Sequence, residues 1–154
     1  MPNPIDRTES ATGQPSPAYP MAIPPGHFRL SAEADKMIRR TSFSTEAWED
    51  EAHPVFGLVA AIGGIGIPIG EVFASCGGAI DQGPLLASCV LHFARPLKIG
   101  ITYQVNGTVE SVTRKPSRRF GAADHLRLCI DVRDGDTPYS RLTLTVVMPM
   151  GSAA

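Results

Sequence analysis

A histidine stands at the start of the most apolar stretch of the chain, and it is the residue best placed for acid–base chemistry. His53 opens a run in which no side chain is charged until Glu71. If that run is helical, the unpaired backbone N–H groups and the dipole at its start favour negative charge beside them. An imidazole titrates near neutral pH, so His53 is a candidate general base or acid. Asp50 could orient it. The alternative is a capping histidine and an acidic residue that suits a helix start.

A second group of chemically useful residues is a dense basic segment in the second half of the chain. Arg114, Lys115, Arg118 and Arg119 surround Pro116. Guanidinium groups match phosphate oxygens in geometry and charge, so the segment is a candidate phosphate-binding loop. A solvated hairpin loop explains the same residues equally well.

The remaining histidines and the cysteines do not indicate a metal site. His92 falls in an apolar strand pattern and His125 on a polar strand face, and neither has acidic residues at ligand spacing. Three cysteines, Cys76, Cys89 and Cys129, are too few and too widely spaced for a disulfide framework or a zinc site. We expect reduced thiols, no metal and a cytoplasmic location.

Length and charge limit the classes of partner. A chain of 154 residues fits one domain, and a hydrophobic fraction of 43% is ordinary for a globular protein. The net charge of -1 gives no reason to expect nucleic acid or anionic lipid as a partner. The N-terminus lacks the basic start and apolar core of a signal peptide.

The elements that must position these residues begin with the stretch from Ala52 to Gly77. It predicts one long helix that is apolar on all faces and therefore buried, with Pro68 and Gly70 bending or ending it. A membrane span is the rival interpretation, but the run has five glycines and no flanking basic cluster, so we expect no membrane. A phosphate loop at residues 63–66 is disfavoured because no Lys-Ser or Lys-Thr follows.

Before this helix, the first 26 residues are rich in proline and predict a disordered or surface-draped tail. We place the domain boundary between a tail of residues 1–27 and a single domain of residues 28–150. Ser31 is a plausible N-cap for a helix over 32–40. A short acidic helix over 45–52 is predicted next, with Trp48 anchoring it to the core.

After the helix, the sequence predicts four strands. Residues 85–93 form a largely apolar run, and residues 101–113, 125–133 and 141–148 alternate apolar with polar side chains. Asp134-Gly135 is a hairpin signal. Gly107 within a strand suggests a bend or bulge.

This layout resembles the hot-dog fold. Phe93-Ala94-Arg95-Pro96-Leu97-Lys98-Ile99-Gly100, an alternating strand and then Arg114-Lys115 resemble the F-x-R-P-L-x-x-G … V-x-x-V-x-x-K stretch of the MaoC-like hydratases and dehydratases. Ala52-His53-Pro54 resembles the Ala-His-Gly or Ala-Pro-Pro that opens their central helix. The resemblance covers residues 41 to 149. It implies an α+β fold in which a curved antiparallel β-sheet wraps around one long central α-helix.

The resemblance also implies a ligand and a partner. The substrate would be an acyl thioester on coenzyme A or on the phosphopantetheine of an acyl carrier protein, with no further cofactor. An acyl tunnel would follow the central helix past Phe56, Gly57 and Ala60, and the basic segment would hold carrier phosphates. The amides at the helix start would hold the thioester oxygen as it becomes enolate-like. The chain would form a homodimer, or a heterodimer with another hot-dog chain.

Two departures from the family pattern bear on the reaction. The catalytic members carry an Asp followed five positions later by a His, and here Asp35 and Asp50 lack that histidine. The thioesterase branches place an acidic residue within the central helix, where this chain has apolar residues 59–62. The pattern is nearest to the N-terminal-type half-domains that lack the dyad.

The expected function is therefore R-specific enoyl-CoA hydratase or 3-hydroxyacyl dehydratase activity, either alone around His53 or as a half-site subunit. Three alternatives stay open: an acyl-CoA thioesterase, a non-catalytic scaffold subunit and a polyketide-tailoring dehydratase or cyclase.

Overall fold

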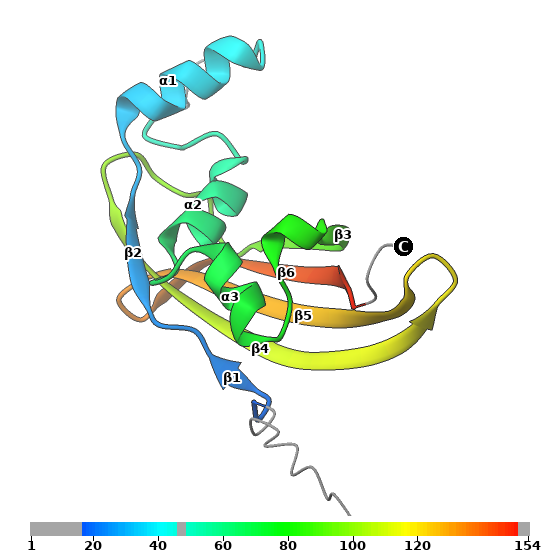
Figure 1. Ribbon diagram of the computed structural model, residues 1–154. Coiled ribbons are helices and arrows are strands. Elements are labelled where there is room, and N and C mark those ends of the chain that lie inside the picture. Colours follow the sequence, from blue (N-terminus) through cyan, green and yellow to red (C-terminus); the bar gives the residue numbers. More distant parts are fainter. Residues whose placement is uncertain (1–16, 46–48, 151–154) are drawn as a thin grey trace, which may run out of the picture.

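In the computed structural model, which describes residues 17–45 and 49–150, an antiparallel sheet of six strands curves around a central helix that is broken in two (Figure 1). The strands lie in the order β1-β4-β5-β6-β3, and β2 also pairs with β4. Their bounds are Met21–Ala22 (β1), Gly26–Arg29 (β2), Leu85–Phe93 (β3), Thr102–Ser117 (β4), Gly121–Asp134 (β5) and Thr137–Pro149 (β6). The predicted antiparallel sheet is confirmed.

Alternating side chains explain why the long strands form one curved layer. In β5, Leu126, Leu128, Ile130 and Val132 are fully buried against the helical layer. Their neighbours face the outer surface, where Arg141 of β6 pairs with Asp131 of β5 at 2.7 Å. Apolar and polar residues at a period of two thus separate the core face from the solvent face.

The glycine in mid-strand has a different cause from the one we predicted. A Cβ on Gly107 would lie 2.9 Å from the side chain of Ile23, so this glycine makes room for the N-terminal segment. The irregularity in β4 lies further along, between Val109 and Ser111. The predicted hairpin turn at Gly135, where φ is +57°, joins β5 to β6.

The central helix consists of α2, Phe56–Gly64, and α3, Ile69–Ser75, which meet at an angle of 57°. The break begins at Ile65, before the proline that was expected to cause it. Gly66 donates a 2.7 Å hydrogen bond to the carbonyl of Pro24, and a Cβ on Gly66 would lie 2.5 Å from that oxygen. Contact with the N-terminal segment therefore accompanies the bend.

By length and apolar composition, no single helix in residues 17–45 and 49–150 could cross a membrane, and only the bent pair α2 and α3 passes that test together.

The N-terminal segment adds the strands β1 and β2 to the sheet. Residues 1–16 of the predicted tail lie outside the described part of the chain. Residues 21–26 lie along β4, where Ile23 is 4% exposed and donates a backbone hydrogen bond of 2.9 Å to Gly107.

The segment between the first helix and α2 differs from the prediction. Helix α1, Ala32–Thr41, begins as expected behind Ser31, whose side chain accepts a hydrogen bond from the N–H of Ala34. Residues 46–48, including Trp48, lie outside the described residues, and the residues that follow are not helical. Glu51 forms an isolated antiparallel bridge with Lys98 because this segment pairs with residues 97–99 instead of coiling. A short 3₁₀ helix, η1, spans Ile80–Gln82 after α3.

Candidate functional site

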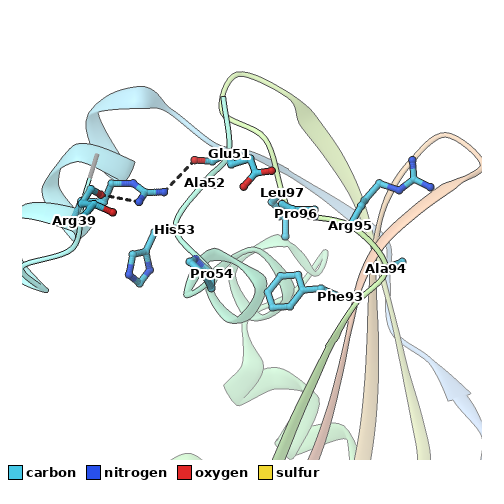
Figure 2. A pocket seen from close by; sticks show the side chains of 11 residues that line it. Arg39, Glu51, Ala52, His53, Pro54, Phe93, Ala94, Arg95, Pro96 and Leu97 are labelled. Carbon is cyan, nitrogen blue, oxygen red and sulfur yellow. Dashed lines mark hydrogen bonds between the residues drawn. The ribbon is translucent and has the colours of Figure 1, made fainter. Parts of the chain in front are cut away.

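A cavity of about 500 Å³ lies where the start of α2 faces the segment that follows β3 (Figure 2). Residues 51–54 form one wall and residues 93–97 form the other. The lining consists of Arg39, Thr45, Glu51, Ala52, His53, Pro54, Phe93, Ala94, Arg95, Pro96 and Leu97. The cavity therefore joins His53 to the Phe-x-Arg-Pro-Leu motif.

Backbone hydrogen bonds hold the two walls together. The N–H of Ala52 donates to the carbonyl of Leu97, and the N–H of Ile99 donates to the carbonyl of Asp50, both at 2.8 Å. Behind the second wall, the buried hydroxyl of Tyr103 accepts a 2.6 Å hydrogen bond from the backbone N–H of Lys98. Side chains on either wall thus project from a fixed backbone.

A buried ion pair ties α1 to the cavity. Asp35 is 1% exposed, and its carboxylate accepts hydrogen bonds of 2.7 Å from Nε of Arg39 and from the backbone N–H of His53. Arg39 also donates to the carbonyls of Thr45 at 2.9 Å and Glu51 at 3.0 Å (Figure 2). Sequence reasoning considered Asp35 only as a dyad member and missed this role, although the Asp-to-Arg spacing of four on a helix was a usable signal.

Both ring nitrogens of His53 have partners. Nδ1 accepts a 3.2 Å hydrogen bond from the N–H of Val55, and Nε2 lies 3.1 Å from Oγ of Ser44. Ser44 lies 2.8 Å from Ser42, which donates to the carbonyl of Ile38 at 2.7 Å. The donor directions are consistent only if Nε2 carries the proton, because Nδ1 is an acceptor. In Figure 2 the ring lies on the Arg39 side of the chain, away from Phe93.

The amides at the start of α2 are also engaged. Phe56 donates to the carbonyl of His53, Gly57 to that of Pro54 and Leu58 to that of Val55, each at 3.0 Å. The free N–H groups that we expected beside His53 are therefore bonded within the helix start, and no oxyanion site is preformed there.

Two neighbouring carboxylates differ in where they lie. Asp50 is exposed, and the Asp50–His53 hydrogen bond that would orient the ring is not among those found in the described residues. The side chain of Glu51 is directed into the space between the walls, near Leu97 (Figure 2). Glu51 is thus a carboxylate of the cavity that the sequence analysis did not single out.

The residues expected along an acyl tunnel are packed in the core. Phe56 is 3% exposed and Ala60 is fully buried. A Cβ on Gly57 would lie 2.6 Å from the ring of Phe93, so the glycine lets that ring rest on α2 at the floor of the cavity. Contact of a ligand with Gly57 requires the Phe93 ring to move, and Phe56 and Ala60 have almost no exposed surface.

The basic residues lie far from His53. Arg114 and Lys115 belong to the end of β4, while Arg118 and Arg119 lie in the turn before β5, at the tip of the long hairpin (Figure 1). Arg114 makes a two-pronged pair with Asp124, at 2.8 and 3.1 Å, which raises the pKa of its guanidinium. Within one chain, therefore, the basic segment does not lie beside the cavity.

The described residues contain no group of three or more His, Cys, Asp or Glu that could hold a metal ion. Cys76, Cys89 and Cys129 are free thiols, and burial raises the pKa of Cys76 and of Cys129.

Strand β3 is an edge of the sheet. It pairs with β6 on one side only, and within the described part of the chain its other side has no partner. Leu85, Leu86 and Val90 are 49%, 61% and 57% exposed. A long apolar edge of this kind presents unpaired backbone groups to a further strand.

Comparison with solved structures identifies proteins that share this fold. No protein-family model and no curated protein matches the chain. The ChsH1-ChsH2 complex of Mycobacterium tuberculosis matches with a TM-score of 0.62 and 13% identity, over 86% of both chains. The HadBC (3R-hydroxyacyl-ACP dehydratase) complex of the same organism matches with a TM-score of 0.60 and 17% identity, over 83% of this chain and 95% of that one.

A hot-dog-like protein from Thermanaerovibrio acidaminovorans matches at a TM-score of 0.53 and 14% identity, over 85% of this chain and 83% of that chain. The chain has the hot-dog fold. A MaoC-like dehydratase from Phytophthora capsici and a probable thioesterase from Bartonella henselae match as well. Their TM-scores are 0.58 and 0.52, at 11% and 9% identity, over 88% and 83% of this chain and 50% and 93% of theirs. The resemblance found in the sequence is confirmed at the level of the fold.

Proposed function

We propose that this hot-dog protein binds an acyl thioester, carried on coenzyme A or on an acyl carrier protein, and takes part in adding or removing water across the 2,3 bond. The observation that carries the proposal is the cavity between the start of α2 and residues 93–97. Pro54, Phe93 and Leu97 give it an apolar lining, and Glu51 and His53 give it polar groups, which is the usual make-up of a small-molecule site. Dehydratases among the structural neighbours support the reaction class.

The roles of the site residues follow from their contacts. Nδ1 of His53 accepts from the N–H of Val55 and Nε2 faces the hydroxyl of Ser44, so the ring would have to leave both partners before it could exchange a proton with substrate. Asp50 would have to turn toward His53 to orient it. Arg114, Lys115, Arg118 and Arg119 would hold the phosphates of the carrier.

The half-site form of this activity is favoured over a chain that works alone. His53 and the amides of α2 are committed to internal hydrogen bonds, so a second hot-dog chain would contribute catalytic groups. Two neighbours were solved as complexes, ChsH1-ChsH2 and HadBC, which supports a hot-dog partner.

The experiment is to follow the enoyl absorbance of crotonyl-CoA and longer enoyl-CoAs with the purified protein, alone and with a MaoC-like partner that carries an Asp/His dyad. We expect hydration with the partner and little or none without it. His53→Ala should slow hydration if the ring acts on substrate, and unchanged turnover would end its catalytic role. Absence of both hydration and binding in either preparation would refute the proposal.

A thioesterase is the second candidate. Glu51 places a carboxylate in the cavity that could activate water, although the central helix has only apolar residues at 59–62. Release of free thiol from the same acyl-CoAs, without loss of a 2,3 double bond, would select this reaction.

A further inference from the structure

The floor of the cavity is an aromatic ring that rests on a glycine. Phe93, the last residue of β3, is half-buried, and a Cβ on Gly57 of α2 would lie 2.6 Å from Cζ of its ring. Figure 2 shows the ring directed from its strand toward α2. In the described chain β3 has a neighbouring strand on one side only, and Phe93 lines the cavity. The ring therefore borders open space into which it can turn.

A buried hydroxyl without a hydrogen-bond partner lies opposite Phe93. Ser140 of β6 pairs with Phe93 in the β3–β6 register and is 6% exposed. Within residues 17–45 and 49–150, its Oγ is the one buried side-chain oxygen or nitrogen that has no partner. Ser140 also borders a small hollow on the outer face of the sheet, but its Oγ is shielded from solvent there. Because an unpaired buried hydroxyl costs free energy, such groups are rare in folded proteins.

The register places this hydroxyl on the same face of the sheet as the ring. Leu142, two residues further along β6, and Val132, opposite Ser140 on β5, are both fully buried beneath the helices. Side chains two positions apart on a strand share a face, and those directly opposite across a strand pair lie roughly 5 Å apart at Cβ. Ser140 and Phe93 are therefore neighbours beneath α2. Turning the ring aside opens the Phe93 side of Ser140 to the cavity.

We propose that Ser140 is a specificity-determining residue covered by Phe93: when an acyl thioester binds, the ring turns off Gly57 and the serine hydroxyl bonds to the 3-hydroxyl of a 3-hydroxyacyl group. A serine hydroxyl both donates and accepts a hydrogen bond, which matches another hydroxyl. An acyl chain that lacks this oxygen leaves Ser140 unpaired. This inference rests on the proposed function, since it names the residue that contacts the oxygen added or removed in that reaction.

Ligand preference tests the role of Ser140. The purified full-length chain is titrated calorimetrically with (3R)-3-hydroxyoctanoyl-CoA and with octanoyl-CoA, which differ in one oxygen. We expect the native protein to bind the hydroxylated ligand about five- to tenfold more tightly, the effect of one additional hydrogen bond. Ser140→Ala should bind both ligands with the native affinity for octanoyl-CoA. Ser88→Ala, at an exposed serine on β3, is the matched control and should keep the preference.

Thermal unfolding separates this role from a structural one. In the free protein the hydroxyl of Ser140 bonds to no other described residue, so Ser140→Ala should leave the unfolding midpoint unchanged or raise it. A hydroxyl needed for the fold would lower the midpoint when removed. Loss of the ligand preference without loss of stability therefore assigns Ser140 to the ligand.

Shortening Phe93 tests the covering ring. Phe93→Ala should tighten binding of both CoA thioesters by a similar factor and keep the preference between them, because no ring has to be displaced. Phe93→Leu, which keeps more of the apolar volume, should act in the same direction if the alanine variant is poorly folded by far-UV circular dichroism. Val90→Ala, at an exposed position on the same strand, is the control and should change neither affinity. Weaker binding of both ligands in the folded Phe93 variants would show that the ring holds the ligand instead of covering its site.

The titrations distinguish failure of the inference from failure of the proposed function. Equal affinity of the native protein for the two ligands, or a preference that survives Ser140→Ala, overturns the inference and leaves thioester binding intact. If the native protein binds neither ligand, the proposed function fails, and the role of Ser140 fails with it.

Discussion

At His53, the surrounding hydrogen bonds decide which chemistry the ring can do. A general base needs a free nitrogen lone pair, and Nδ1 already accepts from the N–H of Val55. Nε2 faces a chain of serine hydroxyls that ends on the carbonyl of Ile38. The ring therefore serves the loop before α2 as a structural link, and any acid–base role requires it to leave these partners.

Asp35 fixes the same loop from the other side. Its buried carboxylate joins Arg39 to the backbone of His53, and removing one partner of such a pair leaves the other without compensation. We expect Asp35→Asn to lower the free energy of unfolding by roughly 3 kcal/mol or more, measured by urea denaturation. Asp50→Asn, at an exposed position, is the matched control and should change it by less than about 0.5 kcal/mol. Equal effects would show that the ion pair does not hold the loop.

Two tyrosines make stability depend on pH in the alkaline range. Burial raises the pKa of Tyr103 to about 12, and burial together with the contact with Cys76 raises the pKa of Tyr19 to about 12. Both phenols are held protonated in the folded state, so their contribution is complete below the unfolded pKa of about 10 and is lost as pH rises toward 12.

We therefore expect the midpoint of urea unfolding to fall as pH rises above the ordinary pKa of the buried thiols Cys76 and Cys129, and to fall further above about 10, where the tyrosines ionise in the unfolded chain. Absorbance at 295 nm should show Tyr19 and Tyr103 still protonated at pH 11. Tyr103→Phe should remove one of these two. Full ionisation of all three below pH 11 in the folded protein would contradict the burial argument.

At the scale of elements, the sequence predicted those helices and strands that depend on neighbouring residues. The alternation in β4, β5 and β6 and the N-cap at Ser31 need only neighbours in sequence, and each prediction was confirmed. Features that depend on contacts between residues far apart in the chain could not be predicted from the sequence. The break at Ile65 meets Pro24, and the Asp35–His53 hydrogen bond joins residues 18 positions apart. The same holds for the candidate site, because its motif residues could be identified from the sequence but the residues they contact could not.

Two glycines, Gly63 at the end of α2 and Gly66 within the helix break, give opposite predictions. A Cβ on Gly63 would lie 3.7 Å from the ring of Phe28, an ordinary contact, so Gly63→Ala should stabilise the protein by about 0.5–1 kcal/mol through helix propensity. A Cβ on Gly66 would lie 2.5 Å from the carbonyl oxygens of Pro24 and Pro25, which are backbone atoms and cannot turn aside. Gly66→Ala should destabilise it by roughly 1–3 kcal/mol. Thermal unfolding of both variants is the measurement, and a stabilised Gly66→Ala would mean that residues 24–25 do not hold the break.

At the scale of the whole molecule, the two candidate binding regions lie apart. The cavity has an apolar lining and the carboxylate of Glu51, the hairpin end carries the cations, and the edge of β3 that has no partner in the described chain runs between them. Neither end is unusual alone. Their separation explains why residue patterns in one chain pointed to a ligand class more clearly than to a reaction.

A charge on the edge of β3 tests the expected dimer. Val90 is 57% exposed in the single chain, so Val90→Lys should leave its fold and its circular dichroism unchanged. In a β3-to-β3 pair, however, the same change sets two lysines near each other on the joined edges, which opposes pairing. Sedimentation equilibrium should show the native protein as a dimer and Val90→Lys dissociating at a protein concentration at least about tenfold higher. Gln104→Lys adds the same charge on β4, whose two sides are already paired with β2 and β5, and should remain dimeric. A Val90→Lys protein that dimerises as tightly as Gln104→Lys would place the contact between copies elsewhere on the molecule.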